Sequence, residues 1–205
     1  MQNPWQKYGG GKMKQIHQLV KALFRMVEIK DIKTATHSKA VAHYSRALGT
    51  ELRLSEKELD ILWDAALIHD IGKIMVDNAI IHKIGDMTEN EYHAIKEHPV
   101  KGMQITESFH LNDSIVDAAW HHHERWDGLG YPEGLKGEEI PYVARIICCA
   151  DCFDAMATKR VYKEPISLEN IANEFKRCEG THFDPKIAEV VVHMMNSGKL
   201  KPYTA

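Results

Sequence analysis

Histidines and acidic residues gather in three blocks of this chain, and their types suit metal-dependent chemistry. HHHERWDGLGYP runs from His121 to Pro132, HDIGK runs from His69 to Lys73, and ADCFDAMATKRVYK runs from Ala150 to Lys163. Adjacent imidazoles are costly to bury, and Gly128 and Gly130 are costly in a helix, so we expect a helix that presents histidines to a ligand and then turns sharply. Imidazoles and carboxylates on rigid elements can bind metals that activate water.

Two carboxylates in these blocks are placed to take part in such a site. Asp70 follows His69 at the expected end of a helix, where the chain enters a turn containing glycine. A carboxylate can bridge two metals and an imidazole cannot, so Asp70 is the natural bridge. Asp151 lies in an otherwise apolar run over residues 143–157, where a metal would compensate its buried charge. We therefore expect a two-metal centre that shares Asp70.

Together the three blocks resemble the HD-GYP family, a branch of the HD metal-dependent phosphohydrolases that cleaves cyclic dinucleotides. The resemblance runs from about residue 31 to about residue 195. It implies an all-α fold, an HD-type helical bundle with a metal centre in its core. The resemblance implies seven metal ligands: His37, His69, Asp70, His98, His122, His123 and Asp151. This mixture of imidazoles and carboxylates suits iron or manganese, whereas zinc sites are often rich in thiolates.

One position departs from the family pattern. Some members carry a glutamate four residues before the first ligand histidine, where it helps to bind a third metal. The segment here is DIKTATH, and Lys33 takes that position before His37. An ammonium group cannot ligate a cation, so we expect two divalent transition-metal ions, iron or manganese.

The resemblance also implies residues that act on the substrate. Lys73 lies one turn beyond Asp70, where it can meet a phosphate oxygen, and both residues are assigned to catalysis. Arg160 and Lys163 match family positions that contact substrate phosphates, which arginine can bind through two parallel hydrogen bonds. We expect Glu124 to support a ligand imidazole from behind. For Asp154, three roles stay open: orienting a ligand, pairing with Arg160, or holding a water.

The resemblance implies a cyclic-di-GMP phosphodiesterase that yields pGpG, with further cleavage to GMP left open. In such sites a water activated between two metals, about 3.5–4 Å apart, attacks phosphorus in line. Preference for linear pGpG or another cyclic dinucleotide, and a non-catalytic nucleotide-binding module, remain alternatives. A di-iron oxygenase could use the same ligands, but the phosphate-binding cations favour phosphorus chemistry. A protein partner at the loop over residues 127–132 and a homodimer also stay open.

The composition of the chain limits which partners and which cellular location we expect. A net charge of −3 argues against a broad nucleic-acid-binding surface, so we expect no DNA partner. The longest apolar runs are too short to cross a bilayer, and we expect no membrane association. Four cysteines in 205 residues do not make a secreted disulfide framework. The CxxC at Cys149 and Cys152 lies in a helical pattern without a second CxxC, so we expect reduced thiols and a cytoplasmic location.

Helical periodicity recurs along the chain and no sustained two-residue alternation interrupts it. We expect helices over 12–30 and 37–54, then helices opened by Ser55 and Thr88, each with a glutamate three residues later. Further helices should begin at Asn112 or Asp113 and reach His123, and run from Pro141 to about Thr158. The last two should begin at Ser167 and Asp184. The expected divisions are a flexible segment and amphipathic helix over 1–30, the HD-GYP domain over 31–198, and a tail over 199–205.

Overall fold

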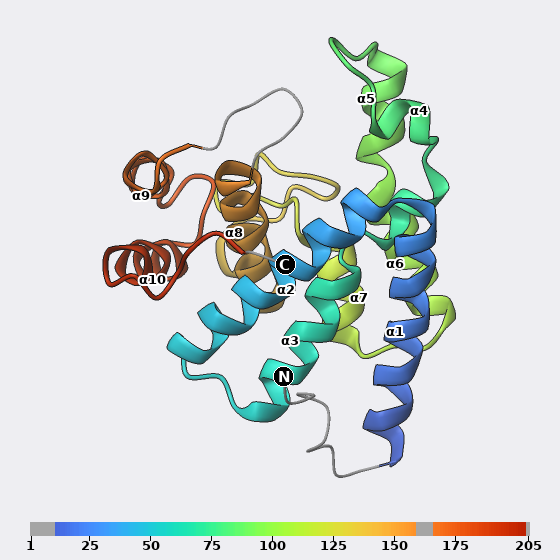
Figure 1. Cartoon of the computed structure of the whole chain (residues 1–205), viewed down its shortest axis with the longest axis horizontal. Helices are drawn as coiled ribbons and strands as arrows, with labels where there is room; N and C mark the ends of the chain where they lie inside the picture. The colour runs from blue at the N-terminus through green and yellow to red at the C-terminus, as the bar shows by residue number, and fades with distance from the viewer. Residues whose placement is uncertain (1–10, 159–165, 204–205) are drawn as a thin grey trace.

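The computed structural model describes residues 11–158 and 166–203, and these residues fold into helices joined by short connections (Figure 1). Within those ranges the chain has no β-strand, only an isolated bridge between Glu179 and Phe183. The all-α prediction is therefore confirmed. In chain order the elements are α1 (Gly11–Lys30), α2 (Ile32–Glu51), α3 (Glu56–Ile68), the 3-10 helix η2 (Ile71–Met75), α4 (Asn78–Ile81), α5 (Glu89–Lys96), α6 (His98–Ser108), α7 (Asp113–His121), η3 (Gly137–Glu139), α8 (Tyr142–Ala157), α9 (Leu168–Arg177) and α10 (Pro185–Asn196).

Most helices begin where the sequence predicts. Ser55 and Thr88 each accept a hydrogen bond from the N–H group three residues on, and the glutamates at those positions bond back to the cap. These reciprocal bonds satisfy N–H groups that a helix otherwise leaves unpaired. The side chains of Asn112, Ser167 and Asp184 cap α7, α9 and α10 by accepting hydrogen bonds from N–H groups two or three residues on.

Three helix ends differ from the prediction. Asp31 caps α2 by accepting hydrogen bonds from the N–H groups of Lys33 and Thr34, so the helix begins at Ile32 instead of near His37. Pro141 is the N-cap of α8 and not its first helical residue. Helix α7 ends at His121, so the next two histidines lie in the turn that follows. The first difference arises because the sequence prediction did not include Asp31 as the N-cap of α2.

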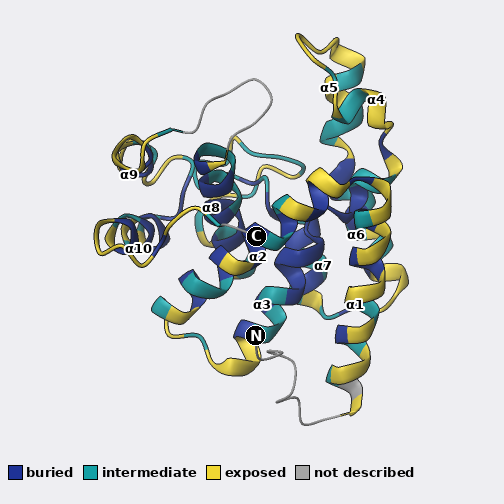
Figure 2. Ribbon diagram, in the orientation of Figure 1, coloured by how far each residue is buried: buried dark blue, intermediate teal, exposed yellow. Residues whose placement is uncertain are grey.

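Helices α2, α3, α7 and α8 surround the core, and their inward faces are buried (Figure 2). Helix α1 packs on α2, α3 and η2 and buries Val20, Leu23 and Val27. On the other side of the molecule, α9 and α10 pack on each other and on α8 (Figure 1). The short helices α4 and α5 project from the body and have no buried residue. This arrangement brings α2, α3, α6, α7 and α8 to one place.

A close backbone approach fixes the segment that follows α3. Gly72 in η2 packs directly on the start of α6, and a Cβ atom there would overlap the carbonyl oxygen of His98 and lie 2.6 Å from the nitrogen of Gly102. Only glycine allows two backbones to approach this closely. Because Gly72 lies two residues after Asp70, this contact brings the HD pair beside His98.

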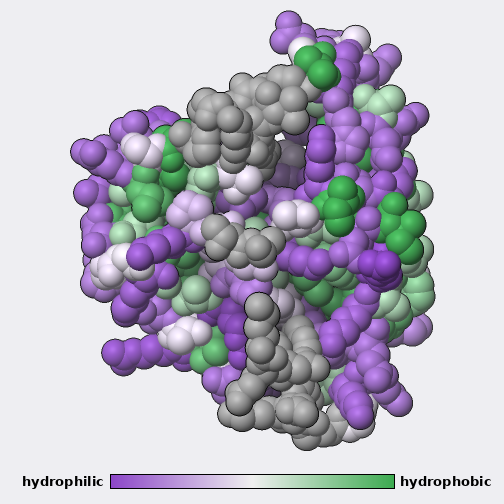
Figure 3. All heavy atoms as spheres, viewed as in Figure 1, coloured by the Kyte–Doolittle hydropathy of each residue, from purple (hydrophilic) through white to green (hydrophobic). Residues whose placement is uncertain are grey.

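The face of the molecule shown in Figure 3 is mainly hydrophilic. Apolar side chains on the face shown in Figure 3 form separate patches among charged and polar ones. Among the described residues, no helix is both long enough and apolar enough to cross a bilayer.

Candidate metal centre

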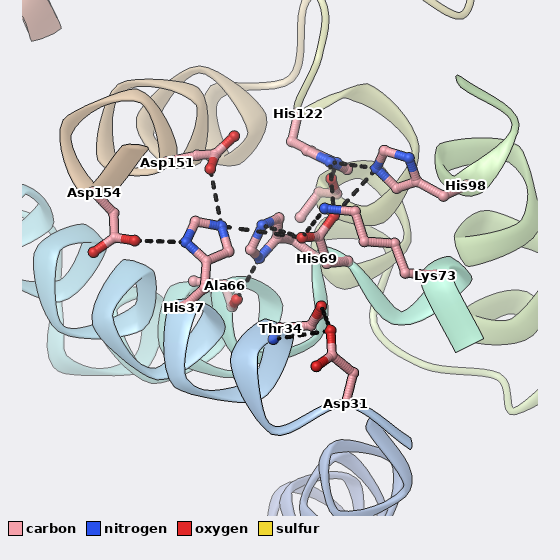
Figure 4. Close-up of polar contacts among 12 residues, drawn as sticks. Asp31, Thr34, His37, Ala66, His69, Lys73, His98, His122, Asp151 and Asp154 are labelled. Atoms are coloured by element: carbon pink, nitrogen blue, oxygen red, sulfur yellow. Dashed lines mark hydrogen bonds and ion pairs between the residues drawn. The ribbon is translucent and has the colours of Figure 1, made fainter. Parts of the chain in front are cut away.

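The seven predicted metal ligands all come from the ends or inner faces of helices, and Figure 4 labels His37, His69, His98, His122 and Asp151 among them. His37 lies in the second turn of α2, and His69 and Asp70 follow the last residue of α3. His98 is the first residue of α6. His122 and His123 follow α7, and Asp151 lies in the middle of α8.

Two groups of donor atoms within this cluster share a single residue. One group comprises His37, His69 and Asp70, and the other comprises Asp70, His98, His122 and His123. Within each group the donor atoms lie within 4.8 Å of one another. Asp70 belongs to both, as expected of a bridging carboxylate. Asp151 adjoins the first group, with its Oδ1 atom 3.0 Å from Nε2 of His37.

Backbone carbonyls orient three of the imidazoles. Nδ1 of His69 donates to the carbonyl of Ala66 at 2.7 Å, and Nδ1 of His98 donates to that of Ile95 at 2.7 Å. Nδ1 of His122 donates in the same way to Ala118 at 2.9 Å. With the proton on Nδ1, each ring directs the lone pair of Nε2 into the cluster. This is the tautomer that binds a metal through Nε2.

The cluster is electrostatically incomplete without a cation. Nε2 of His98 and Nε2 of His122 lie 3.2 Å apart, and Oδ1 of Asp70 lies 3.1 and 3.7 Å from them. Two lone pairs and an anionic oxygen therefore face one another in a buried space. Nε2 of His69 is also buried and makes no hydrogen bond to any described residue. Buried polar atoms in this state need a partner, and a metal cation would serve all of them, so the residues fit the predicted metals.

His37 is oriented by a side chain and not by the backbone. Its Nδ1 atom lies 2.6 Å from Oδ2 of Asp154, and its Nε2 atom faces Asp151. Burial disfavours the imidazolium, but the hydrogen bonds to the two carboxylates outweigh it and raise the pKa of His37 to about 9. Oδ1 of Asp154 accepts a further hydrogen bond, from the Thr158 hydroxyl. Among the described residues Asp154 thus contacts His37, and its role in orienting a ligand stays a prediction.

Nearby positive charge keeps Asp70 ionised, and burial keeps the neighbouring His69 neutral. Burial alone would raise the pKa of Asp70, but the ammonium of Lys73, 2.6 Å from Oδ2, and the nearby imidazoles hold it well below its usual value. Burial lowers the pKa of His69 to about 4. Neutral imidazoles and an ionised carboxylate are the forms that bind metal at neutral pH.

We predict that Asp154→Ala weakens metal binding by the group that contains His37. The variant loses the carboxylate that His37 Nδ1 contacts, and removing a carboxylate behind a ligand histidine typically costs about ten- to a hundredfold in metal affinity. Titration calorimetry with Mn²⁺ would measure the change. Asp154→Asn keeps an oxygen acceptor and should recover part of the affinity. Unchanged binding in the alanine variant would contradict this orienting role.

The predicted role of Glu124 is corrected by the structure. Its Oε1 atom accepts hydrogen bonds from the backbone N–H groups of Glu133 and Gly134, at 2.7 and 3.1 Å, and not from a ligand imidazole. Glu124 therefore holds the closing end of the glycine-rich loop. Gly130 packs so closely on Glu124 that a Cβ atom would lie 2.5 Å from its Cα, which explains a glycine here. The reason for the error is that a sequence neighbour of histidines can point away from them at a helix end.

A stacked contact behind His123 was not predicted. The ring of Tyr131 stacks on the imidazole of His123, with centroids 4.8 Å apart and planes at 22°. The Lys96 ammonium lies over the same ring, 4.6 Å from the Tyr131 centroid. Tyr131 thus supports His123, whose ring has no backbone hydrogen bond within the described part of the chain. The sequence analysis noted Tyr131 as part of the loop motif, but no motif or spacing pointed to Lys96.

Three residues singled out by the sequence, Arg160, Lys163 and Lys33, have no described contact with the metal cluster. Arg160 and Lys163 lie outside the described residues. Lys33 is exposed on the first turn of α2. The prediction of two metals therefore still rests on residue type at that position.

Comparisons with known proteins agree with this geometry. The family model described as HD domain matches residues 21–187. The chain is 36% identical over 177 residues to the 3'3'-cGAMP-specific phosphodiesterase 2 of Vibrio cholerae, covering 85% of this chain and 34% of that protein. It is 34% identical to a cyclic di-GMP phosphodiesterase of Thermotoga maritima, covering 87% of this chain and 49% of that protein. The chain thus spans between about a third and a half of these curated relatives.

Solved structures share the fold. A cyclic GMP-AMP specific phosphodiesterase of V. cholerae superposes with a TM-score of 0.67 at 22% identity, covering 88% of this chain and 49% of that one. The HD domain of the Listeria monocytogenes phosphodiesterase PgpH, in complex with cyclic-di-AMP, superposes with a TM-score of 0.61 at 16% identity. That match covers 90% of this chain and 100% of that one.

Proposed function

The chain belongs to the HD domain family, in its HD-GYP branch, and we propose on this basis that it is a metal-dependent phosphodiesterase that hydrolyses cyclic-di-GMP to pGpG. Further hydrolysis to GMP is a second step of the same chemistry. The free cysteines fit the cytoplasmic location that the sequence predicts. We also propose, as possibilities that stay open, that the protein forms a homodimer and that a protein partner binds the loop over residues 127–132.

The observation that carries this proposal is the pair of donor groups that share Asp70. Two neighbouring groups of imidazoles with one common carboxylate suit two closely spaced divalent metals. When bound, such metals supply Lewis-acid activation of water and charge stabilisation at phosphorus. Nitrogen and oxygen donors without a thiolate favour iron or manganese, which we propose as the native metals.

The protein's own residues would orient the substrate and balance charge. Lys73 already directs its ammonium at Oδ2 of Asp70, and its side chain is partly exposed. With metals on Asp70, this ammonium would turn to a phosphate oxygen of the substrate and stabilise negative charge there. Arg160 and Lys163 would hold the second phosphate, arginine through its planar fork.

We expect the protein to hold about two transition-metal ions per chain when purified without chelator. Each of the two donor groups around Asp70 can hold one ion, and Lys33 cannot ligate a third. Elemental analysis of the purified protein, before and after loading with iron or manganese, would measure it. Three tightly held ions would contradict the inference from Lys33. A value near zero that neither metal restores would contradict the ligand assignment.

Arg160→Ala should raise the substrate KM without changing metal content. A lost charged hydrogen bond costs roughly 1.5–3 kcal/mol, which is about ten- to a hundredfold in affinity. Arg160→Lys should recover only part, because the two parallel hydrogen bonds are lost. Steady-state kinetics on cyclic-di-GMP and on a small artificial phosphodiester would separate the phosphates. An equal loss on both would place Arg160 at the reacting phosphate, and metal loss would contradict its assignment to substrate.

Product analysis with iron- or manganese-loaded protein tests the function directly. Chromatography of reactions with cyclic-di-GMP should show pGpG, formed faster than any product from the other candidate substrates. The second candidate is a mixed cyclic GMP-AMP dinucleotide, because several similar proteins are named as 3'3'-cGAMP-specific phosphodiesterases. If that dinucleotide or linear pGpG is cleaved faster, it is the preferred substrate instead of cyclic-di-GMP. Tight nucleotide binding without cleavage by the metal-loaded protein would favour a non-catalytic module.

A further inference from the structure

A second cluster of metal-binding side chains lies on the face of α8 that the proposed phosphodiesterase centre does not use. Cys148 and Cys152 are one helical turn apart, and His182 approaches them from the connection between α9 and α10. The two Sγ atoms and a ring nitrogen of His182 all lie within 4.8 Å of one another. The CxxC pattern in the sequence points to Cys149 instead, but that thiol is fully buried and does not belong to the group, in which Cys148 is buried and Cys152 is partly exposed.

We propose that Cys148, Cys152 and His182 form a separate site for a thiophilic divalent cation, with Zn²⁺ as the natural occupant. Two thiolates and an imidazole are a preferred zinc donor set, and the softness of sulfur separates this site from the nitrogen and oxygen cluster around Asp70. Two thiolates would also neutralise the charge of the dication, which lowers the cost of holding it in a partly buried place.

The distances suit a tetrahedral ion. Sγ of Cys152 and Nε2 of His182 lie 3.9 Å apart. With usual zinc bond lengths and a tetrahedral angle, a sulfur and a nitrogen on one ion are about 3.5 Å apart. A small side-chain adjustment therefore closes the site. Cys152 and His182 are partly exposed, so a cation can enter and a solvent molecule can take the fourth position.

His182 is already held in place by its own loop. Its ring stacks on Phe183, with centroids 4.6 Å apart. Its backbone N–H donates to the carbonyl of Cys178 at 3.0 Å, and its carbonyl accepts from the N–H of Trp126 at 3.2 Å. A preformed ligand loses little freedom when the cation binds. The contact with Trp126 also ties this loop to the segment that follows His122 and His123.

The expected result of metal binding here is a strengthened link between α8 and two loops. Cys152 adjoins Asp151 on the same helix, so the cation would hold α8 against the loop at His182 and, through Trp126, against the segment after α7. A ligand that binds only the folded state raises the melting temperature. Zinc at this site would therefore stabilise the arrangement of the ligand-bearing elements without touching a substrate.

Titration of the metal-free protein with Co²⁺ tests the proposal, because cobalt bound to thiolates gives a strong near-ultraviolet charge-transfer band. The wild-type protein should show this band. Cys152→Ser should reduce it by about half or more, because one of two thiolates is gone, and His182→Gln should weaken Co²⁺ binding. Cys178→Ser is the matched control, since that thiol contacts Glu174 instead and its loss should leave the band unchanged.

The test also separates this site from the proposed phosphodiesterase centre. That centre has no sulfur ligand, so Asp70→Ala should keep the thiolate band while it loses the other metals. Excess Zn²⁺ should displace Co²⁺ and remove the band. Absence of the band in the wild-type protein, or an equal band in Cys152→Ser, would overturn the proposal whatever the protein does to cyclic dinucleotides.

Discussion

Asp70→Ala should abolish hydrolysis and release both proposed metals. The two donor groups have only this residue in common, so one substitution removes a ligand from each. Each metal supplies several kcal/mol of transition-state stabilisation, and 1.36 kcal/mol is a factor of ten in rate, so we expect a loss of more than about a thousandfold. Elemental analysis and turnover of cyclic-di-GMP would measure the two effects.

The fold should survive this substitution. The helices around Asp70 have their own apolar faces, which pack together without this carboxylate. Circular dichroism should therefore show the helical content unchanged. Asp86→Ala is a suitable control, because Asp86 is exposed in the connection before α5. Near-normal turnover in Asp70→Ala would contradict the two-metal mechanism.

His98→Ala should remove one metal and leave the other. His98 belongs only to the group with His122 and His123, whereas the group with His37 and His69 keeps all its members. Metal content should fall from about two ions to about one. Turnover should fall by about a hundredfold or more, since the stabilisation supplied by one metal is lost.

Elemental analysis and kinetics on His98→Ala should be compared with His93→Ala. His93 is an exposed histidine on α5, and its loss should change neither value. Loss of both ions in His98→Ala would show that the two metals bind cooperatively and cannot be separated. Retention of both would place His98 outside the ligand set.

The fold class and the convergence of the predicted ligands could be derived from the sequence because local signals were strong. Capping residues such as Ser55 and Thr88 mark helix starts, and a carboxylate beside a histidine at a helix end predicts the shared ligand. Contacts between distant segments were not accessible in this way. The pairing of His37 with Asp154 spans 117 positions, and no spacing rule connects them.

Errors arose where residues adjacent in sequence point in different directions. Glu124 follows two ligand histidines but turns to the backbone of the loop. The same geometry hid the cluster of Cys148, Cys152 and His182, because the CxxC spacing drew attention to Cys149. On a helix, positions four apart share a face and positions three apart do so less closely, so Cys148 and Cys152 lie on the face that His182 approaches.

The hydrogen bonds that orient His69, His98 and His122 give the ligand set an unusual resistance to mutation. Their acceptors are the main-chain carbonyls of Ala66, Ile95 and Ala118, three or four residues earlier in each case. Every amino acid carries that oxygen, so no point mutation at these three positions deletes the acceptor. His37 alone among these four depends on a replaceable side chain, Asp154. Single substitutions at Asp154 can therefore change how His37 is held while the acceptors behind His69, His98 and His122 stay the same.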